Sequence, residues 1–129
     1  MQIKLNTNKK LEIIDITSQI NDLIDVEYGI CNIFTKHSTS AIVVNENEQG
    51  LLNDFKNSLN ELFLENKTYS HNRIDNNAAS HLRSFFLSSS ETVPVKDFKL
   101  DLGTWQSVFF VELDGPRSNR LIEVTVIGG

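Results

Sequence analysis

The side chains best suited to acid–base or metal chemistry in this sequence are its three histidines, His37, His71 and His81. An imidazole exchanges a proton near neutral pH, and its neutral form is a common ligand for transition metals. Three imidazoles and one water molecule would form an open Zn²⁺ site. His81 lies 44 positions after His37 and ten after His71, which matches no short metal motif. Exposed or hydrogen-bonded histidines are therefore the alternative interpretation.

Two of the histidines lie in the stretch 69–83, which is polar in its first half. Asn76 or Asn77 is a suitable N-cap for a following helix, so His81 is expected near the first turns of that helix. The N-terminus of a helix presents free N–H groups and a positive dipole end, which favour an anion. We expect this stretch to form one wall of a site.

Carboxylates and amides cluster after the apolar run 41–44, where Asn45, Glu46 and Asn47 precede a predicted helix that contains Asp54. Glu46 and Asp54 are candidates for acid–base or ligand-orienting roles. The alternative is that acidic side chains here, Glu48 included, interact with the positive end of the helix.

Two further segments combine polar groups with special residues. The segment 103–106 joins a glycine, a hydroxyl, an amide and the only tryptophan in an expected strand, and we predict that Trp105 packs in the core rather than stacking on a ligand. The segment 114–117 predicts a turn, and Arg117 and Arg120 are possible phosphate forks.

The hydrophobic pattern predicts an α+β chain. An opening β-hairpin is expected from 3–5 and 11–16, followed by a short helix that begins at Thr17 or Ser18 and stops near Gly29. Strands are expected at 30–35 and 41–44, and apolar residues recur at helical spacing over 51–63 and 78–87. The remainder predicts strands at 92–95, 100–106, 107–113 and 121–127. We expect antiparallel-rich, sandwich-like sheets packed with two main helices.

Length and composition predict one domain over residues 1–129, because 129 residues with 40% hydrophobic content form a single core. The net charge of −5 and pI of about 5.1 argue against nucleic acid or an anionic membrane as a partner. Cys31, the only cysteine, is expected to be a small core residue. The N-terminus resembles no signal peptide and no apolar run reaches membrane-spanning length, so we expect a cytoplasmic protein.

Taken in order, the motifs of the whole chain resemble the YjbQ family, whose members are described as secondary thiamine-phosphate synthases. The resemblance is carried by the segments 34–41, 45–48, 69–71, 77–81, 93–95, 102–106 and 114–117, together with Asp54. The chain departs from the family at Ser38, where many members have threonine, and at 87–91, where many have a glycine after the helix.

The resemblance implies an α+β fold, a homotrimer with polar pockets near subunit boundaries, and a metal ion or anion near the histidines. Its implied reaction joins a hydroxymethylpyrimidine pyrophosphate to a thiazole phosphate and releases pyrophosphate. The catalytic candidates are His37, His81, Glu46 and Asp54, and the metal candidates are His37, His71 and His81. The substrate-binding candidates are Ser38, Thr39, Asn45, Asn47, Asn77, Thr104, Gln106 and Arg117.

The identity of the metal and the reaction remain open at this point. Imidazoles favour Zn²⁺, whereas Mg²⁺ prefers the oxygens of Asp54, Glu46 or the substrate, and the chain has no Asp-Asp-x-x-Asp diphosphate motif. One alternative is a metal-dependent hydrolase of a small phosphorylated or amide substrate, with Glu46 or Glu48 as base. The other is a non-catalytic trimer that binds a small molecule.

Overall fold

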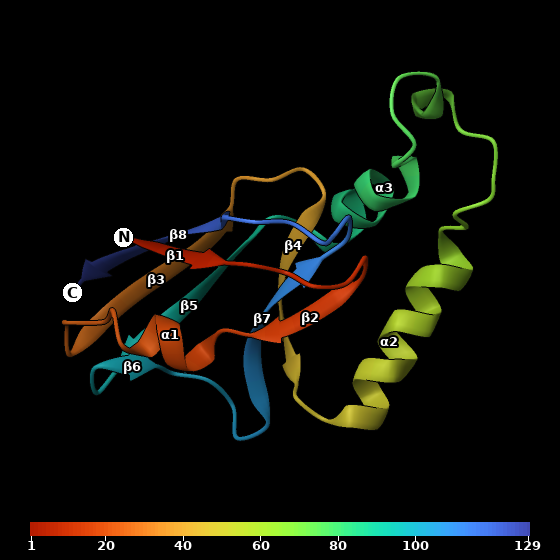
Figure 1. Ribbon diagram of the computed structural model, residues 1–129. Coiled ribbons are helices and arrows are strands. Elements are labelled where there is room, and N and C mark those ends of the chain that lie inside the picture. Colours follow the sequence, from red (N-terminus) through yellow and green to blue (C-terminus); the bar gives the residue numbers. More distant parts are fainter.

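Two antiparallel sheets form the body of the protein (Figure 1). The computed structural model describes residues 1–129. The larger sheet has the order β1 (Gln2–Leu5), β8 (Arg120–Gly128), β3 (Tyr28–Thr35), β5 (Ser90–Lys96) and β6 (Lys99–Leu100). The smaller sheet has the order β2 (Glu12–Asp15), β7 (Gln106–Glu112) and β4 (Ser40–Glu46).

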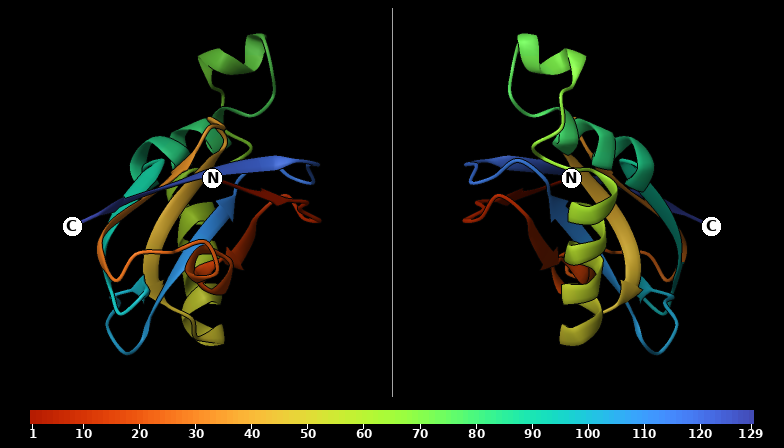
Figure 2. Two further views of the ribbon diagram at one scale, coloured as in Figure 1. Left: turned by 90° about the vertical axis from the view of Figure 1, so that its left-hand side faces the viewer. Right: turned by 90° about the vertical axis from the view of Figure 1, so that its right-hand side faces the viewer.

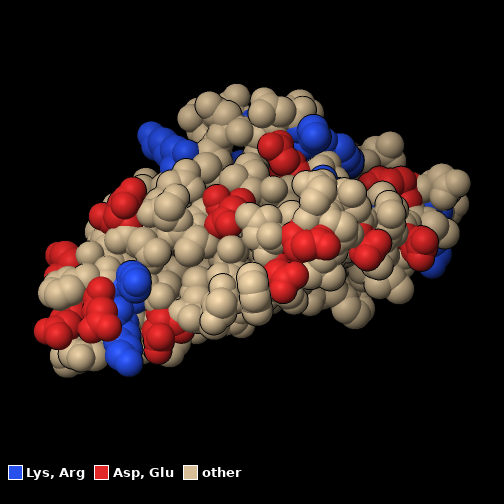
Figure 3. Space-filling view, turned by 90° about the horizontal axis from the view of Figure 1, so that it is seen from below, with Lys and Arg blue, Asp and Glu red and all other residues tan.

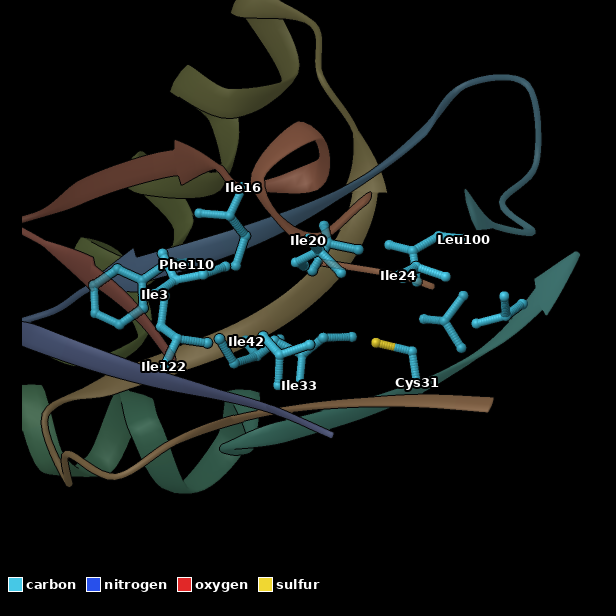
Figure 4. Close-up of a cluster of buried hydrophobic side chains, with 14 residues drawn as sticks. Ile3, Ile16, Ile20, Ile24, Cys31, Ile33, Ile42, Leu100, Phe110 and Ile122 are labelled. Carbon is cyan, nitrogen blue, oxygen red and sulfur yellow. The ribbon is translucent and has the colours of Figure 1, made fainter. Parts of the chain in front are cut away.

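The main core lies between the two sheets. Alternation along each strand directs one set of side chains inward, so that Ile33 and Ile122 of the larger sheet approach Ile42 and Phe110 of the smaller one (Figure 4). Cys31 is fully buried in this cluster, as predicted. The helix α1 (Thr17–Asn21) adds Ile20 to the same core.

The other two helices cover the opposite face of the smaller sheet. A second cluster joins Leu59 of α2 (Gln49–Leu62) to Ala41 and Val111 of the strands, and Leu87 of α3 (Ala78–Leu87) packs against it. Between the helices the chain forms a single 3₁₀ turn, η1 (Ser70–Arg73), and this segment stands away from the rest of the molecule (Figure 2).

These elements confirm the predicted α+β class and both main helices. The periodic residues of 51–63 and 78–87 become α2 and α3, because an apolar stripe at helical spacing can be buried on one side only. Glu48 caps α2, since its carboxylate accepts a hydrogen bond from Leu51 N at 2.8 Å. The capping interpretation of Glu48 is therefore the one that the structure supports.

Three local predictions are wrong. The opening segments form no hairpin, because β1 pairs with β8 and β2 with β7, in different sheets. The first helix is shorter than expected, ends at Asn21 and has Ile16 at its N-cap position. The segment 101–105 is a loop, in which Trp105 is 73% exposed rather than part of the core.

No helix is long and apolar enough to cross a membrane. In the view from below, acidic side chains are spread over the surface and basic ones lie mainly toward its margins (Figure 3). This distribution agrees with the net charge of −5.

Candidate functional site

Two of the three histidines are neighbours. The rings of His71, in η1, and His81, in α3, have centroids 4.8 Å apart and are inclined at 72° in an edge-on arrangement. They come together because Asn72 ties η1 to the helix, where its Oδ1 accepts a hydrogen bond from Ala78 N at 3.2 Å. The first turn of α3 is therefore capped by Asn72, whereas the Asn77 side chain makes no cap bond and Asn76 is exposed.

A chain of polar side chains continues from His71 into the body of the protein. Its Nε2 lies 2.9 Å from Oδ1 of Asn77, and the amide nitrogen of Asn77 donates to Oδ2 of Asp114 at 3.0 Å. Asp114 follows β7 in the turn that leads to the cis Gly115–Pro116 bond. Asn77, the middle member of this chain, is buried, whereas His71 is exposed.

Asp114 is held in its ionised form. Burial favours the neutral carboxyl, but hydrogen bonds from Asn77, Lys10 and Arg117 and the charge of Lys10 outweigh burial and lower the pKa of Asp114 to about 2. Lys10 Nζ and an Arg117 terminal nitrogen each lie 2.9 Å from its carboxylate oxygens. Arg117, predicted to bind substrate, is thus engaged with Asp114, although its side chain is 49% exposed.

His37 has a different environment. It lies between β3 and β4, and its Nε2 accepts a hydrogen bond from Leu121 N at 2.9 Å. Desolvation and the charges of Arg120 and Arg117 lower the pKa of His37, against an opposing effect of Glu112. His37 is therefore a neutral histidine near pH 7, with its proton on Nδ1.

A buried ion pair lies beside His37. Arg120 Nε donates to Oε1 of Glu112 at 2.9 Å, and the same guanidinium donates to Thr39 Oγ1 at 3.0 Å. Burial acts to raise the pKa of Glu112, but hydrogen bonds from Arg120 and Thr7 lower it. In the single chain Arg120 and Thr39 are buried and hydrogen-bonded to each other. The phosphate-fork role of Arg120 and the substrate-binding role of Thr39 stay predictions.

Two cavities adjoin at His81 and Phe85, which line both. One, of about 370 Å³, is otherwise lined by hydroxyl groups, those of Ser38, Ser84, Ser88 and Ser89. The other, of about 340 Å³, is also lined by His71, Tyr69, Ser70, Ala78 and Leu82. His81 therefore stands between a hydroxyl-rich space and a more apolar one.

Several members of this site were not predicted from the sequence. Ser84 and Phe85 lie three and four residues after His81, a spacing that places them on its face of the helix and could have identified them.

Ser88 is the C-cap residue of α3 and has φ of 76° and ψ of 159°. This conformation favours glycine. The departure from the family pattern in this segment thus falls on a strained residue at the edge of the hydroxyl-rich cavity. The only signal for Asp114 in the sequence is its position as an acidic residue after an apolar strand.

The remaining candidates lie at the other end of β4. Ser40 begins this strand next to His37 and Glu46 ends it. A strand of this length separates its two ends by roughly 20 Å. Asn45 and Glu46 line a different, apolar cavity of about 260 Å³ between α2 and the smaller sheet. Glu46 is the strand partner of Gln106, and Asn47 Nδ2 donates to Asp15 at 2.9 Å. Thr104 and Asp54 are exposed.

The single chain does not assemble the predicted three-histidine metal site. No group of three His, Cys, Asp or Glu side chains lies close enough together to hold a metal ion. His37 uses Nε2 to accept the Leu121 N–H, which leaves it no free lone pair in its neutral form. His71 and His81 alone remain as neighbouring ligands, so the residues of one chain do not fit a complete metal centre.

Comparison with known proteins gives a consistent result. The sequence model of the UPF0047 protein YjbQ-like family matches residues 1–129. A UPF0047 protein of Methanothermobacter thermautotrophicus is 50% identical over 98% of this chain and 90% of its own length, and one of Archaeoglobus fulgidus is 44% identical over 95% and 97%. The crystal structure of a YbjQ-like protein of unknown function from Sulfolobus solfataricus P2 superposes with a TM-score of 0.96 at 42% identity, covering 100% of this chain and 96% of that one. With this agreement over its whole length, the chain belongs to the YjbQ-like UPF0047 family.

Proposed function

We propose that this chain is a cytoplasmic small-molecule enzyme that acts on a phosphorylated substrate, with His81 and His71 as its reactive groups. The observation that carries the proposal is the position of His81, which contacts His71 and stands between two adjoining cavities. Imidazoles transfer protons near neutral pH and donate hydrogen bonds to a leaving group that gains negative charge.

The chemistry of the cavity lining supports an anionic substrate. Hydroxyl groups such as those of Ser38 and Ser89 are neutral donors that can surround phosphate oxygens. Lys10 and Arg117 together carry one more positive charge than Asp114 neutralises, and Asp114 is joined through Asn77 to His71 at the cavity edge. Phe85 is 82% exposed. Its aromatic face offers a stacking surface for a planar ring beside His81.

The specific reaction that we propose is the transfer implied by the family resemblance. The thiazole nitrogen attacks the methylene carbon of the hydroxymethylpyrimidine pyrophosphate, and the carbon–oxygen bond to pyrophosphate breaks. The products are thiamine phosphate and pyrophosphate, and the bond-forming nitrogen has no proton to lose. Stabilising the departing pyrophosphate is therefore the main demand on the protein, and His81, with the serine hydroxyl groups, would meet it.

The test is a thiamine-phosphate assay with purified protein and both substrates. We expect His81→Ala and His71→Ala to lower kcat by about 10²–10⁴-fold, the usual contribution of a positioned acid or base. Asn76→Ala is the matched control, because Asn76 is the exposed neighbour of Asn77. Wild-type activity in His81→Ala would overturn the proposal.

A metal-dependent hydrolase is a second candidate, favoured by the pairing of the His71 and His81 imidazoles. Zn²⁺ or Mg²⁺ would need further ligands from the substrate or another subunit, because one chain supplies no third ligand at this place. Stoichiometric metal in protein purified without a histidine tag, together with hydrolysis of phosphorylated or amide substrates, would support it. Full activity in metal-free protein would exclude it.

We further propose that the chain assembles as a homotrimer. Exposed apolar side chains on the larger sheet, such as Ile30 and Ile127, and on α3, such as Phe85 and Phe86, support self-association. Assembly would also allow the Glu46 end of one subunit to meet the histidine end of another. If the trimer only binds a metabolite, thermal-shift screening will detect a phosphorylated ligand in the absence of any product.

A further inference from the structure

The hydrogen-bond chain from Asp114 to His71 determines which nitrogen of His71 carries a proton. Its starting point is the Asp114 carboxylate, which is ionised and therefore only accepts hydrogen bonds. Lys10 donates to one of its oxygens, and Arg117 and Asn77 donate to the other. Every partner of this carboxylate must therefore present a donor.

Asn77 has only one orientation that meets this requirement. Its amide nitrogen must face Asp114, because the amide oxygen in that position would oppose a carboxylate oxygen at 3.0 Å. With the nitrogen so placed, Oδ1 faces His71 and can only accept. Asn77 is buried, and both of its side-chain hydrogen bonds are partly buried.

The last step concerns the imidazole. Since Oδ1 of Asn77 accepts and lies 2.9 Å from Nε2 of His71, that nitrogen must carry the proton. In a neutral imidazole the other nitrogen, Nδ1, then holds the lone pair. His37 provides a contrast within the same chain, because its Nε2 accepts from Leu121 N and its proton must be on Nδ1.

We propose that Asn77 is a positioning residue that holds the proton of neutral His71 on Nε2 and leaves Nδ1 as the only proton acceptor of that ring. This assignment goes beyond the sequence prediction that Asn77 binds substrate. The role of Nδ1 as a base in turnover rests on the proposed function, whereas the position of the proton does not.

The experiment is ¹⁵N NMR of the histidine side chains in the full-length protein, recorded at about pH 8.5, where histidines with ordinary pKa values are neutral. In the wild type we expect His71 to show a protonated Nε2 and an unprotonated Nδ1, and His37 to show the reverse. A protonated Nδ1 in wild-type His71 would overturn the proposal without any variant being made.

A variant at position 77 separates positioning from a merely structural role. In Asn77→Ala we expect a mixture of tautomers, seen as a shift of the two His71 nitrogen resonances toward each other. Because the Asn77 side chain makes no cap bond, this change removes no cap of α3. Asn76→Ala, at the exposed neighbour of Asn77, is the control without effect.

Unchanged His71 resonances in a folded Asn77→Ala protein would also overturn the proposal. The readout needs no turnover, so it distinguishes two failures. If the protein makes no thiamine phosphate but the resonances behave as expected, the proposed reaction is wrong and the positioning role stands. If activity is found, Asn77→Ala is expected to lower kcat while KM stays near the wild-type value.

Discussion

The three histidines have the same side chain but different surroundings, and these surroundings decide which of them can react with a ligand. His37 is tied to the Leu121 backbone beside the Glu112–Arg120 ion pair, so its role is largely set by the fold. His71 and His81 are neighbours at the edge of one cavity, and His81 also lines a second. The candidate reactive groups are therefore His71 and His81. His37 is a neutral histidine held by the backbone.

The pH response of His37 is a prediction at this scale. Its folded pKa lies below the ordinary value of 6.5, so the unfolded chain binds the proton more readily than the folded one. The contribution to stability is thus complete above about pH 6.5 and is lost as the pH falls from there through the folded pKa. His37→Gln keeps an acceptor near the position of Nε2 but does not titrate. We therefore expect it to remove the part of the pH dependence of stability that His37 contributes.

Urea unfolding of both proteins at about pH 7.5 and about pH 5.5 measures the effect, because these values bracket the pKa of an unfolded histidine. The stability of the wild type relative to His37→Gln should be lower at about pH 5.5 than at about pH 7.5. Parallel changes in the two proteins would show that His37 is not the source of the slope.

Site residues can be predicted from the sequence when they lie on the same helix or strand. His81, Ser84 and Phe85 share a helical face that periodicity identifies. By contrast, Asp114 reaches Asn77 across 37 residues, and no local pattern encodes that contact. The size of Trp105 favours burial, but the loop 101–105 leaves it outside both sheets.

At the scale of elements, the junction of α2 and α3 depends on one buried arginine. Arg83 of α3 is 1% exposed and donates to the carbonyl oxygens of Leu59 and Phe63 at 3.3 and 2.7 Å. Leu59 O also accepts from Phe63 N at 3.1 Å, whereas the carbonyl of Phe63, the C-cap residue of α2, lies where a helix leaves its last acceptors without internal partners. Arg83 therefore serves as a C-terminal cap supplied by another helix.

We expect Arg83→Met to destabilise the fold by about 1–3 kcal/mol, because it leaves the Phe63 carbonyl without its donor. The contact of Arg83 with Glu65 contributes little, since that carboxylate is 47% exposed. Glu65→Gln is accordingly the matched control, with an expected loss of less than about 1 kcal/mol. Urea unfolding of the three proteins decides the matter, and equal losses in both variants would show that the ion pair, not the cap, matters.

The elements themselves were predictable to the extent that each is defined by its own periodicity. Both long helices follow from their apolar stripes. The predicted hairpin failed because residues 3–5 and 11–16 each show a valid strand pattern, and alternation does not specify a partner. β1 instead pairs with β8, more than a hundred residues away in the sequence.

At the scale of the whole molecule, the larger sheet has an outer face that no other element covers. Side chains alternate along β3, so Cys31 and Ile33 enter the core while Ile30 and Phe34 point outward. Ile30 is 47% exposed and lies opposite Ile127, which is 61% exposed, on the neighbouring strand. An apolar patch of this kind on a sheet surface is typical of an interface.

We therefore expect the proposed homotrimer to use this face, and Ile30→Lys to dissociate it. In a cyclic trimer one substitution appears three times, and each copy would lose about 2 kcal/mol of apolar burial and place a charge in the contact. Because Ile30 lies outside the core, the monomer should keep its fold and its circular dichroism. Gln19→Lys, on the exposed surface of α1, adds the same charge elsewhere and should leave the assembly intact. Sedimentation velocity distinguishes the states, and a trimeric Ile30→Lys protein would show that another surface, such as the exposed phenylalanines of α3, forms the contact.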